Sequence, residues 1–202
     1  MKKMNITKDN HSAKKIKTVE MILCALFAAL VCIGAFIKVP VSAVPFTFQC
    51  FFVALAGLLL GPKLGAVSVI IYIAMGLIGL PVFTQGGGIG YIFQPTFGYL
   101  IGFIIDAYVT GKIANANSKP SLKRLLCATL TGLVIALFTG MIYYFLMLNL
   151  YLKNDLGIWA AFLYCVVLVA PGDILLCIIA AFAGKKIIPA KNMYIKGDTR
   201  KQ

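Results

Sequence analysis

The sequence predicts an all-α membrane protein that crosses the bilayer several times. Of its 202 residues, 61% are apolar and only 12% are charged, whereas charged residues make up about a quarter of an ordinary soluble domain. The apolar residues form long runs, and the 19 Lys and Arg residues gather almost entirely in the two tails and in short loops. This basic excess is therefore a signal of membrane topology rather than of nucleic-acid binding.

Six apolar runs, bounded by Gly, Pro and charged residues, predict six transmembrane helices. Some runs are shorter than the roughly 20 residues of a perpendicular span, so loops or a locally thin protein edge must complete the crossing. The runs form one membrane domain over residues 21–188, between basic tails at 1–20 and 189–202. They are Met21–Ile37, Phe46–Leu60, Leu64–Leu80, Pro95–Lys112, Leu122–Leu148 and a last region at Ile158–Gly184.

The distribution of positive charge predicts which side each loop faces. With six crossings, every Lys and Arg except Lys38 and Lys153 falls on one side of the membrane. Cytoplasmic loops accumulate Lys and Arg, so both termini are expected in the cytoplasm, and this arrangement requires an even number of crossings.

The last region contains Pro171 and Asp173 and has three possible interpretations. Two separate helices would place the basic C-terminus outside. One straight helix would place a proline and a carboxylate near mid-membrane, where the carboxylate alone costs at least ~2.5 kcal/mol. We therefore expect Ile158–Ala170 to lie as an interfacial or re-entrant segment on the outer side, and the sixth helix to run from Pro171 to about Ile188. Asp173 would then lie in a first turn, beside free backbone N–H groups at the positive helix end.

Uncharged polar residues, aromatic residues and glycines concentrate in the loops expected on the outer side. This combination indicates a pocket for a small ligand that is partly apolar and partly amide-like. The triple glycine Gly86–Gly88 predicts a flexible loop, which either covers the ligand or only turns the chain. Thr84 is expected to be an ordinary turn or cap residue. The candidate ligand-binding residues are Thr47, Gln49, Gly86, Gly87, Gly88, Tyr91, Gln94, Tyr99, Asn149 and Asp173, with Phe83 and Phe93 as further aromatic contacts.

Other residues are expected to have structural roles. The six cysteines lack the spacing of a metal or redox site, and the single histidine, His11, lies in the N-terminal tail, so no metal site is predicted. Asp106 in the fourth helix is expected to be buried against a hydroxyl or a lysine, although intramembrane carboxylates are candidate functional residues. Ala25 and Ala29 lie one helical turn apart, which favours close packing within the chain or docking of a partner subunit.

Four stretches carry a resemblance to a known family. They are VPFTFQCFFVALAGLLLGPKLGAVSVIIYIAMGLIGLPVF (Val44–Phe83), the glycine-rich loop that follows it, QPTFGYLIGF (Gln94–Phe103) and PGD (Pro171–Asp173). Together they resemble the biotin-specific substrate-binding (S) component of energy-coupling-factor (ECF) vitamin transporters, the BioY family. The similarity extends over most of the chain, from about Ala25 to Lys185.

The resemblance implies a high-affinity subunit of an ECF-type ABC transporter that imports biotin through the cell membrane of a prokaryote. Such a subunit is not an enzyme and needs no cofactor, because a transmembrane T protein and two ATPases supply the energy. The stripe of Ala25 and Ala29 would dock the T protein. Asp173 would accept hydrogen bonds from the two N–H groups of the ureido ring.

The chain departs from the family pattern in two motifs. The family usually reads Gly-Pro-Thr-Gly-Gly-Tyr where this chain has Gln94 and Phe97 in place of two glycines. The family also usually reads Pro-Gly-Asp-x-x-Lys, and the lysine position is Leu176 here. The ligand's carboxylate would then be met by Lys38, by Lys153, by a backbone nest or by water.

The departure at Leu176 leaves the ligand open, and a different class of protein is a second alternative. The ligand is either biotin or a related acid such as lipoate or dethiobiotin. A membrane-embedded enzyme is the more remote alternative, because the two membrane carboxylates, Asp106 and Asp173, are expected near opposite faces, and such an enzyme needs converging catalytic groups.

Overall fold

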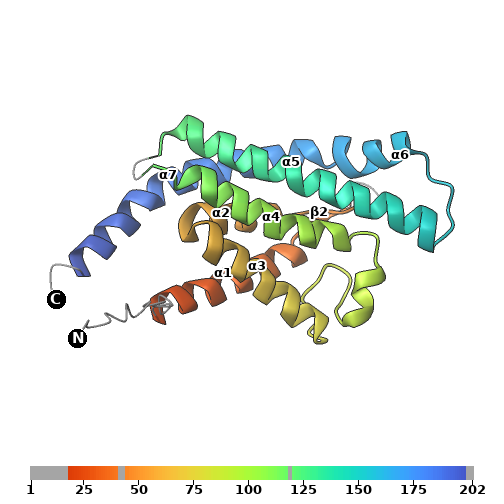
Figure 1. Ribbon diagram of the computed structural model, residues 1–202, viewed down its shortest axis with the longest axis horizontal. Coiled ribbons are helices and arrows are strands. Elements are labelled where there is room, and N and C mark those ends of the chain that lie inside the picture. Colours follow the sequence, from red (N-terminus) through yellow and green to blue (C-terminus); the bar gives the residue numbers. More distant parts are fainter. Residues whose placement is uncertain (1–17, 41–43, 118–119, 199–202) are drawn as a thin grey trace, which may run out of the picture.

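The computed structural model describes residues 18–40, 44–117 and 120–198, with side chains as far as Pro189. The helices pack side by side in an elongated bundle, and α1 begins at the same end of the bundle at which α7 ends (Figure 1). Most of the predicted basic tail at 1–20, and the end of the tail at 189–202, lie outside the described residues.

The first half of the chain forms three helices and a small ribbon that the sequence did not predict. Strands of two residues are too short to show a period-2 pattern, so the ribbon leaves no signal in the sequence. Its two strands are antiparallel, and Lys38 is paired with Thr47. The elements are α1 (Thr18–Phe36), β1 (Lys38–Val39), β2 (Phe46–Thr47), α2 (Gln49–Leu60) and α3 (Pro62–Leu77).

The second half of the chain contains the longer helices and two π-helical turns. α7 continues past the predicted end of the last span at Ile188. The elements are the 3₁₀ turn η1 (Ile89–Phe93), α4 (Phe97–Ala114), α5 (Leu122–Leu146), the π-helical turn η2 (Met147–Tyr151), α6 (Ile158–Phe162), the π-helical turn η3 (Leu163–Val167) and α7 (Ala170–Asp198).

Four helical stretches in the described part of the chain are long and apolar enough to cross a membrane: Thr18–Phe36, Phe97–Ala114, Leu122–Tyr151 and Ile158–Pro189. The helices α2 and α3 are also apolar, but they have only 12 and 16 residues. The protein is thus a mostly helical polytopic membrane protein, in which the two short helices lie between the longer ones in sequence.

The last region differs from the prediction in one respect. α7 begins at Ala170, so Pro171 lies in its first turn as expected. The preceding residues are not a separate segment, because Ile158–Pro189 forms one helical stretch. The π-helical turn η3 explains why the proline is tolerated: Leu168 bonds to the carbonyl of Leu163, five residues earlier. This wider turn makes room for a proline ring that would clash in a regular helix.

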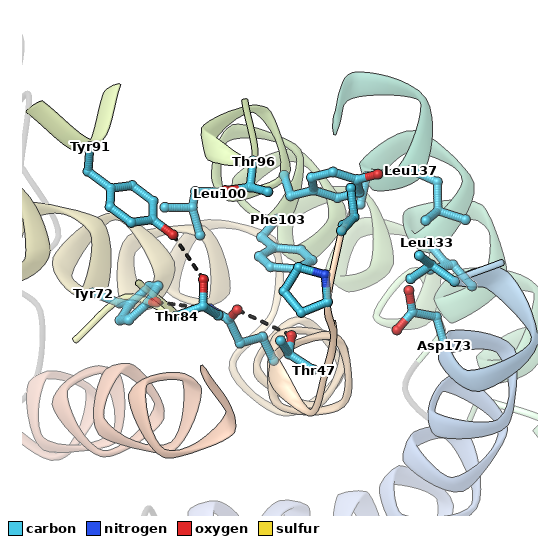
Figure 2. A pocket seen from close by; sticks show the side chains of 16 residues that line it. Thr47, Tyr72, Thr84, Tyr91, Thr96, Leu100, Phe103, Leu133, Leu137 and Asp173 are labelled. Atoms are coloured by element: carbon cyan, nitrogen blue, oxygen red, sulfur yellow. Dashed lines mark hydrogen bonds between the residues drawn. The ribbon is translucent and has the colours of Figure 1, made fainter. Parts of the chain in front are cut away.

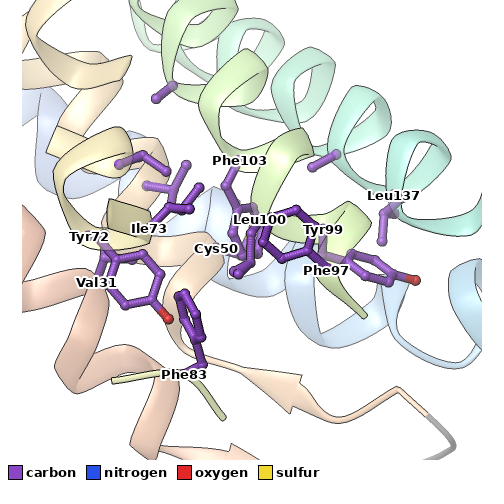
Figure 3. Close-up of a cluster of buried hydrophobic side chains, with 14 of the residues drawn as sticks. Val31, Cys50, Tyr72, Ile73, Phe83, Phe97, Tyr99, Leu100, Phe103 and Leu137 are labelled. Atoms are coloured by element: carbon purple, nitrogen blue, oxygen red, sulfur yellow. The ribbon is translucent and has the colours of Figure 1, made fainter. Parts of the chain in front are cut away.

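The main apolar core lies beside the pocket described below and supplies part of its wall. Figure 3 shows Val31 of α1, Tyr72 of α3 and Phe103 of α4 among the side chains of this core. A second core, which includes Leu58, Leu125 and Ala181, packs α2, α5 and α7. The pocket is therefore backed by closely packed apolar side chains.

Candidate functional site

A pocket lies between the starts of α2 and α4 and the middle of α5. About 580 Å³ between its walls is not filled by protein atoms, and this space includes open solvent. Its walls come from the ribbon, α2, α3, α4, α5, α7 and the loop after α3. The lining residues are Val44, Pro45, Thr47, Gln49, Tyr72, Thr84, Tyr91, Thr96, Tyr99, Leu100, Phe103, Leu133, Ala136, Leu137, Val169 and Asp173.

One wall is held by a chain of hydrogen-bonded side chains (Figure 2). The Thr47 hydroxyl donates to Gln49 Oε1 over 3.2 Å, and Gln49 Nε2 donates to the Tyr72 hydroxyl over 2.9 Å. The Tyr72 hydroxyl donates in turn to the carbonyl of Val82, at 3.1 Å. Because all three side chains are buried, these bonds satisfy groups that would be costly to leave unpaired. They also fix the ribbon, α2, α3 and the loop after α3 relative to one another.

The loop after α3 contributes two hydroxyl groups to the pocket. Thr84 Oγ1 and the Tyr91 hydroxyl lie 2.9 Å apart and share a hydrogen bond. Both residues line the pocket. Thr84, expected to be an ordinary turn residue, therefore presents a side chain to the site.

A third polar contact fixes Tyr99 in the wall. Its hydroxyl donates to the carbonyl of Cys165 over 2.8 Å. Cys165 lies in the π-helical turn η3, where the changed hydrogen-bonding pattern leaves carbonyls in need of partners. Gly140 of α5 leaves room for the ring, since a Cβ there would lie 2.5 Å from Tyr99 Cδ1. The π-helical turn that accommodates Pro171 thus also anchors a pocket residue.

Asp173 supplies the carboxylate of the pocket. It is 7% exposed and lies in the first turn of α7. The N-terminal anion site expected there is not formed, because the helical stretch continues from Ile158 and the Asp173 N–H donates to the carbonyl of Val169 over 3.3 Å. The Asp173 side chain lines the pocket. Leu176, at the family's usual lysine position, is 4% exposed and therefore lies in the apolar interior.

The structure brings half of the predicted site residues together. Thr47, Gln49, Tyr91, Tyr99 and Asp173 all line the pocket. The pocket also has three polar members that the sequence did not mark as ligand residues, Tyr72, Thr84 and Thr96. The signal that could have found Tyr72 is its hydroxyl within an apolar run, since a buried tyrosine usually bonds to a partner.

The other predicted site residues lie outside the pocket lining. Asn149 uses its side-chain amide on the backbone of Leu156, with Nδ2 donating to the carbonyl over 3.1 Å and Oδ1 accepting from the N–H over 2.8 Å. It therefore closes the loop after α5. Gln94 is exposed, and its backbone N–H caps η1 on the carbonyl of Tyr91.

The triple glycine shapes the loop that carries Thr84. Gly86 and Gly88 have φ angles of 113° and 103°, a conformation that favours glycine. Gly86 forms an antiparallel bridge with Phe83, and a Cβ on Gly87 would lie 2.1 Å from the carbonyl of Leu80. These glycines fold the loop on itself and do not line the pocket.

The expected aromatic contacts are also partly different. Phe83 is 1% exposed and packs edge-on against Tyr72, at 5.5 Å between ring centroids, so it supports the pocket from behind. Phe93 stacks on Tyr151, at 5.3 Å, outside the pocket lining. The aromatic surface of the pocket comes instead from Phe103 and from three tyrosines.

Two further predictions concern residues away from the pocket. Asp106 is fully buried in α4 and accepts a hydrogen bond from Thr110 over 2.8 Å, which confirms burial against a hydroxyl. Its Oδ2 has no partner among the described residues. Ala25 and Ala29 are exposed on α1, so their stripe does not pack within the described part of the chain.

The fold and the site define a polytopic helical membrane protein with a pocket among its helices. The model of the BioY family matches residues 7–192. The chain belongs to the BioY family.

The relatives agree with this assignment. The chain is 48% identical over 140 residues, covering 69% of this chain and 71% of the relative, to a probable biotin transporter BioY of Lysinibacillus sphaericus. It is 31% identical over 185 residues, covering 86% and 95%, to the biotin transporter BioY of Rhizobium etli.

A solved structure shares the fold. The chain is similar to the crystal structure of the S-component for biotin from an ECF-type ABC transporter, with a TM-score of 0.73 and 25% identity, over 84% of this chain and 90% of that one. These relatives are transporters and transporter components, so the alternative of a membrane-embedded enzyme is set aside: the protein is not an enzyme.

Proposed function

We propose that the chain is the substrate-binding component of an ECF-type ABC transporter and that it binds biotin for import. The observation that carries the proposal is the pocket itself: a buried carboxylate, Asp173, lines a pocket with polar and aromatic walls in a BioY-family chain. The names of the relatives indicate biotin as the ligand, since the Lysinibacillus sphaericus protein is described as a probable biotin transporter and the Rhizobium etli protein as a biotin transporter.

The chemistry of the lining suits a cyclic urea on an aliphatic chain. The Asp173 carboxylate would accept the two ureido N–H groups in charge-assisted hydrogen bonds. Thr96 Oγ1 is buried without a partner among the described residues, so it offers a donor and acceptor to a polar ligand atom. Phe103, Leu133 and Leu137 provide an apolar surface, against which burial of the ligand stabilises the complex by about 25 cal/mol per Å².

The proposed topology has six membrane helices with both termini in the cytoplasm of a prokaryotic cell. The common end of α1 and α7 supports it, because an even number of crossings brings the two termini to one side (Figure 1). The described basic residues near this end, including Lys63, Lys112, Lys123 and Lys185, follow the positive-inside rule. The pocket would then open toward the outside of the plasma membrane.

The energy for import would come from partner subunits. The chain has no nucleotide-binding loop of the Walker type in its sequence, so a T protein and two ATPases would drive the transport. Ala25 and Ala29 form the proposed docking stripe for the T protein, because small exposed residues on an apolar helix let another helix approach closely.

A binding panel on the purified chain in lipid nanodiscs tests the proposed ligand. We expect the highest affinity for biotin, weaker binding of dethiobiotin, which keeps the urea but lacks the sulfur ring, and no measurable binding of lipoate, which has no urea. Isothermal titration calorimetry measures all three. Tighter binding of lipoate than of biotin would identify lipoate, not biotin, as the preferred ligand. A failure of all three acids to bind would refute the proposed function.

A further inference from the structure

The two ends of the pocket differ in chemistry. Figure 2 shows Asp173 at one end, Thr84, Tyr72 and Tyr91 at the other, and Thr47 and Phe103 between them. One end therefore has an anionic acceptor, and the other has hydroxyl groups. A ligand with a urea at one end and a carboxylate at the other can satisfy both ends in only one orientation.

Lys38 lies at the rim next to the hydroxyl end. Its Nζ donates to the carbonyl of Thr84 over 2.8 Å. In the ribbon Lys38 is directly paired with Thr47, and paired residues of an antiparallel ribbon point to the same face. Both neighbours, Thr47 and Thr84, line the pocket. The bond to Thr84 thus places the lysine ammonium next to a residue of the hydroxyl end, and the strand pairing places the backbone of Lys38 beside Thr47.

The Lys38 ammonium has further N–H donors, and the described pocket lining contains no cationic side chain. A lysine has three N–H donors, and the described structure accounts for one, the bond to Thr84. The pocket lining contains no Lys or Arg, and Leu176 supplies no charge. The other outer lysine, Lys153, lies on the loop after α5, whose residues do not line the pocket.

We propose that Lys38 is the specificity-determining residue for the ligand's carboxylate. The inference rests on the proposed function: with the urea on Asp173, the aliphatic chain passes Phe103 and the carboxylate reaches the rim at Thr84, where it accepts a hydrogen bond from Lys38. The lysine recognises a carboxylate tail and disfavours a neutral one, because only the anion forms a charge-assisted bond.

The test compares biotin with biotinamide, which keeps the ring and chain but has a neutral end, on the full chain in nanodiscs. We expect the natural chain to bind biotin about tenfold more tightly than biotinamide, a typical difference for one charged hydrogen bond. Lys38→Gln should remove this preference by weakening biotin alone, and Lys38→Arg should keep it. Lys153→Gln is the matched control and should behave like the natural chain.

The outcomes separate the inference from the function on which it rests. If Lys38→Gln keeps the preference for biotin, or lowers the affinity for both ligands equally, the lysine only joins the ribbon to the Thr84 loop. The inference is then overturned. A natural chain that binds both ligands equally well also overturns it. If the natural chain binds neither ligand, the proposed function itself fails.

Discussion

Tyr99 shows how one side chain links the pocket to the backbone that supports it. Its hydroxyl satisfies the carbonyl of Cys165 in the π-helical turn η3, and its ring lies against the backbone of Gly140. Tyr99 is 8% exposed, so a polar group on either side of this bond has no access to bulk water. The contact therefore stabilises both the widened turn and the wall of the site.

Removal of the Tyr99 hydroxyl should destabilise the protein without changing the shape of the wall. Tyr99→Phe leaves the Cys165 carbonyl unpaired in an apolar environment, at a cost of about 1–3 kcal/mol. The expected result is a lower midpoint of thermal unfolding in detergent micelles. Tyr108→Phe is the matched control, because Tyr108 lies on the same helix but is 41% exposed. Equal midpoints for the two variants would show that the Tyr99 bond contributes nothing.

The exposed surface of α1 combines small and large apolar side chains. Its exposed residues include Ala25 and Ala29 as well as large apolar side chains such as Leu26, which is 50% exposed. Lipid can cover the large side chains, but a stripe of small residues gains from a helix that packs closely against it. This difference favours a partner subunit on the alanine side of α1.

A large side chain in the alanine stripe should block coupling and leave the ligand site intact. Ala25→Trp is expected to retain biotin affinity, because the stripe is on a helix whose exposed face does not line the pocket. Uptake of labelled biotin by cells that contain the T protein and the ATPases should be lost. Leu26→Trp, a change from one large exposed side chain to another, is the control and should transport normally. Transport by Ala25→Trp at the normal rate would rule out docking at this stripe.

The sequence predicts the helices well because apolar runs and helix breakers are local signals. Gly61 and Pro62 separate α2 from α3, and Pro171 lies in the first turn of α7 as expected. The continuity of α6, η3 and α7 is not visible in the sequence, because the π-helical turn that admits the proline leaves no pattern of its own.

The pocket is predicted less completely because its bonds join distant segments. Gln49 bonds to Tyr72 and Lys38 to Thr84, pairs separated by 23 and 46 residues. Neither pairing follows from local spacing. Asn149 is absent from the pocket lining for the opposite reason. Its partner, Leu156, is only seven residues away, and this local loop contact uses the side-chain amide that was expected to face the ligand.

For the molecule as a whole, α1 begins and α7 ends at the same end of the bundle (Figure 1). The helix starts of α2, α4 and α7 converge on the pocket, since Gln49, Tyr99 and Asp173 all lie in or near first turns. Residues from three separate helices therefore meet in one pocket.

The affinity of Asp173→Asn for biotin tests the central claim most directly. Asparagine keeps the size of the side chain but loses the charge that accepts both ureido N–H groups, so we expect affinity to fall about a hundredfold, as for two charged hydrogen bonds. Asp106→Asn changes the other membrane carboxylate, which lies outside the pocket lining, and should bind biotin like the natural chain. Isothermal titration calorimetry in nanodiscs gives both values. Unchanged affinity in Asp173→Asn would contradict the account.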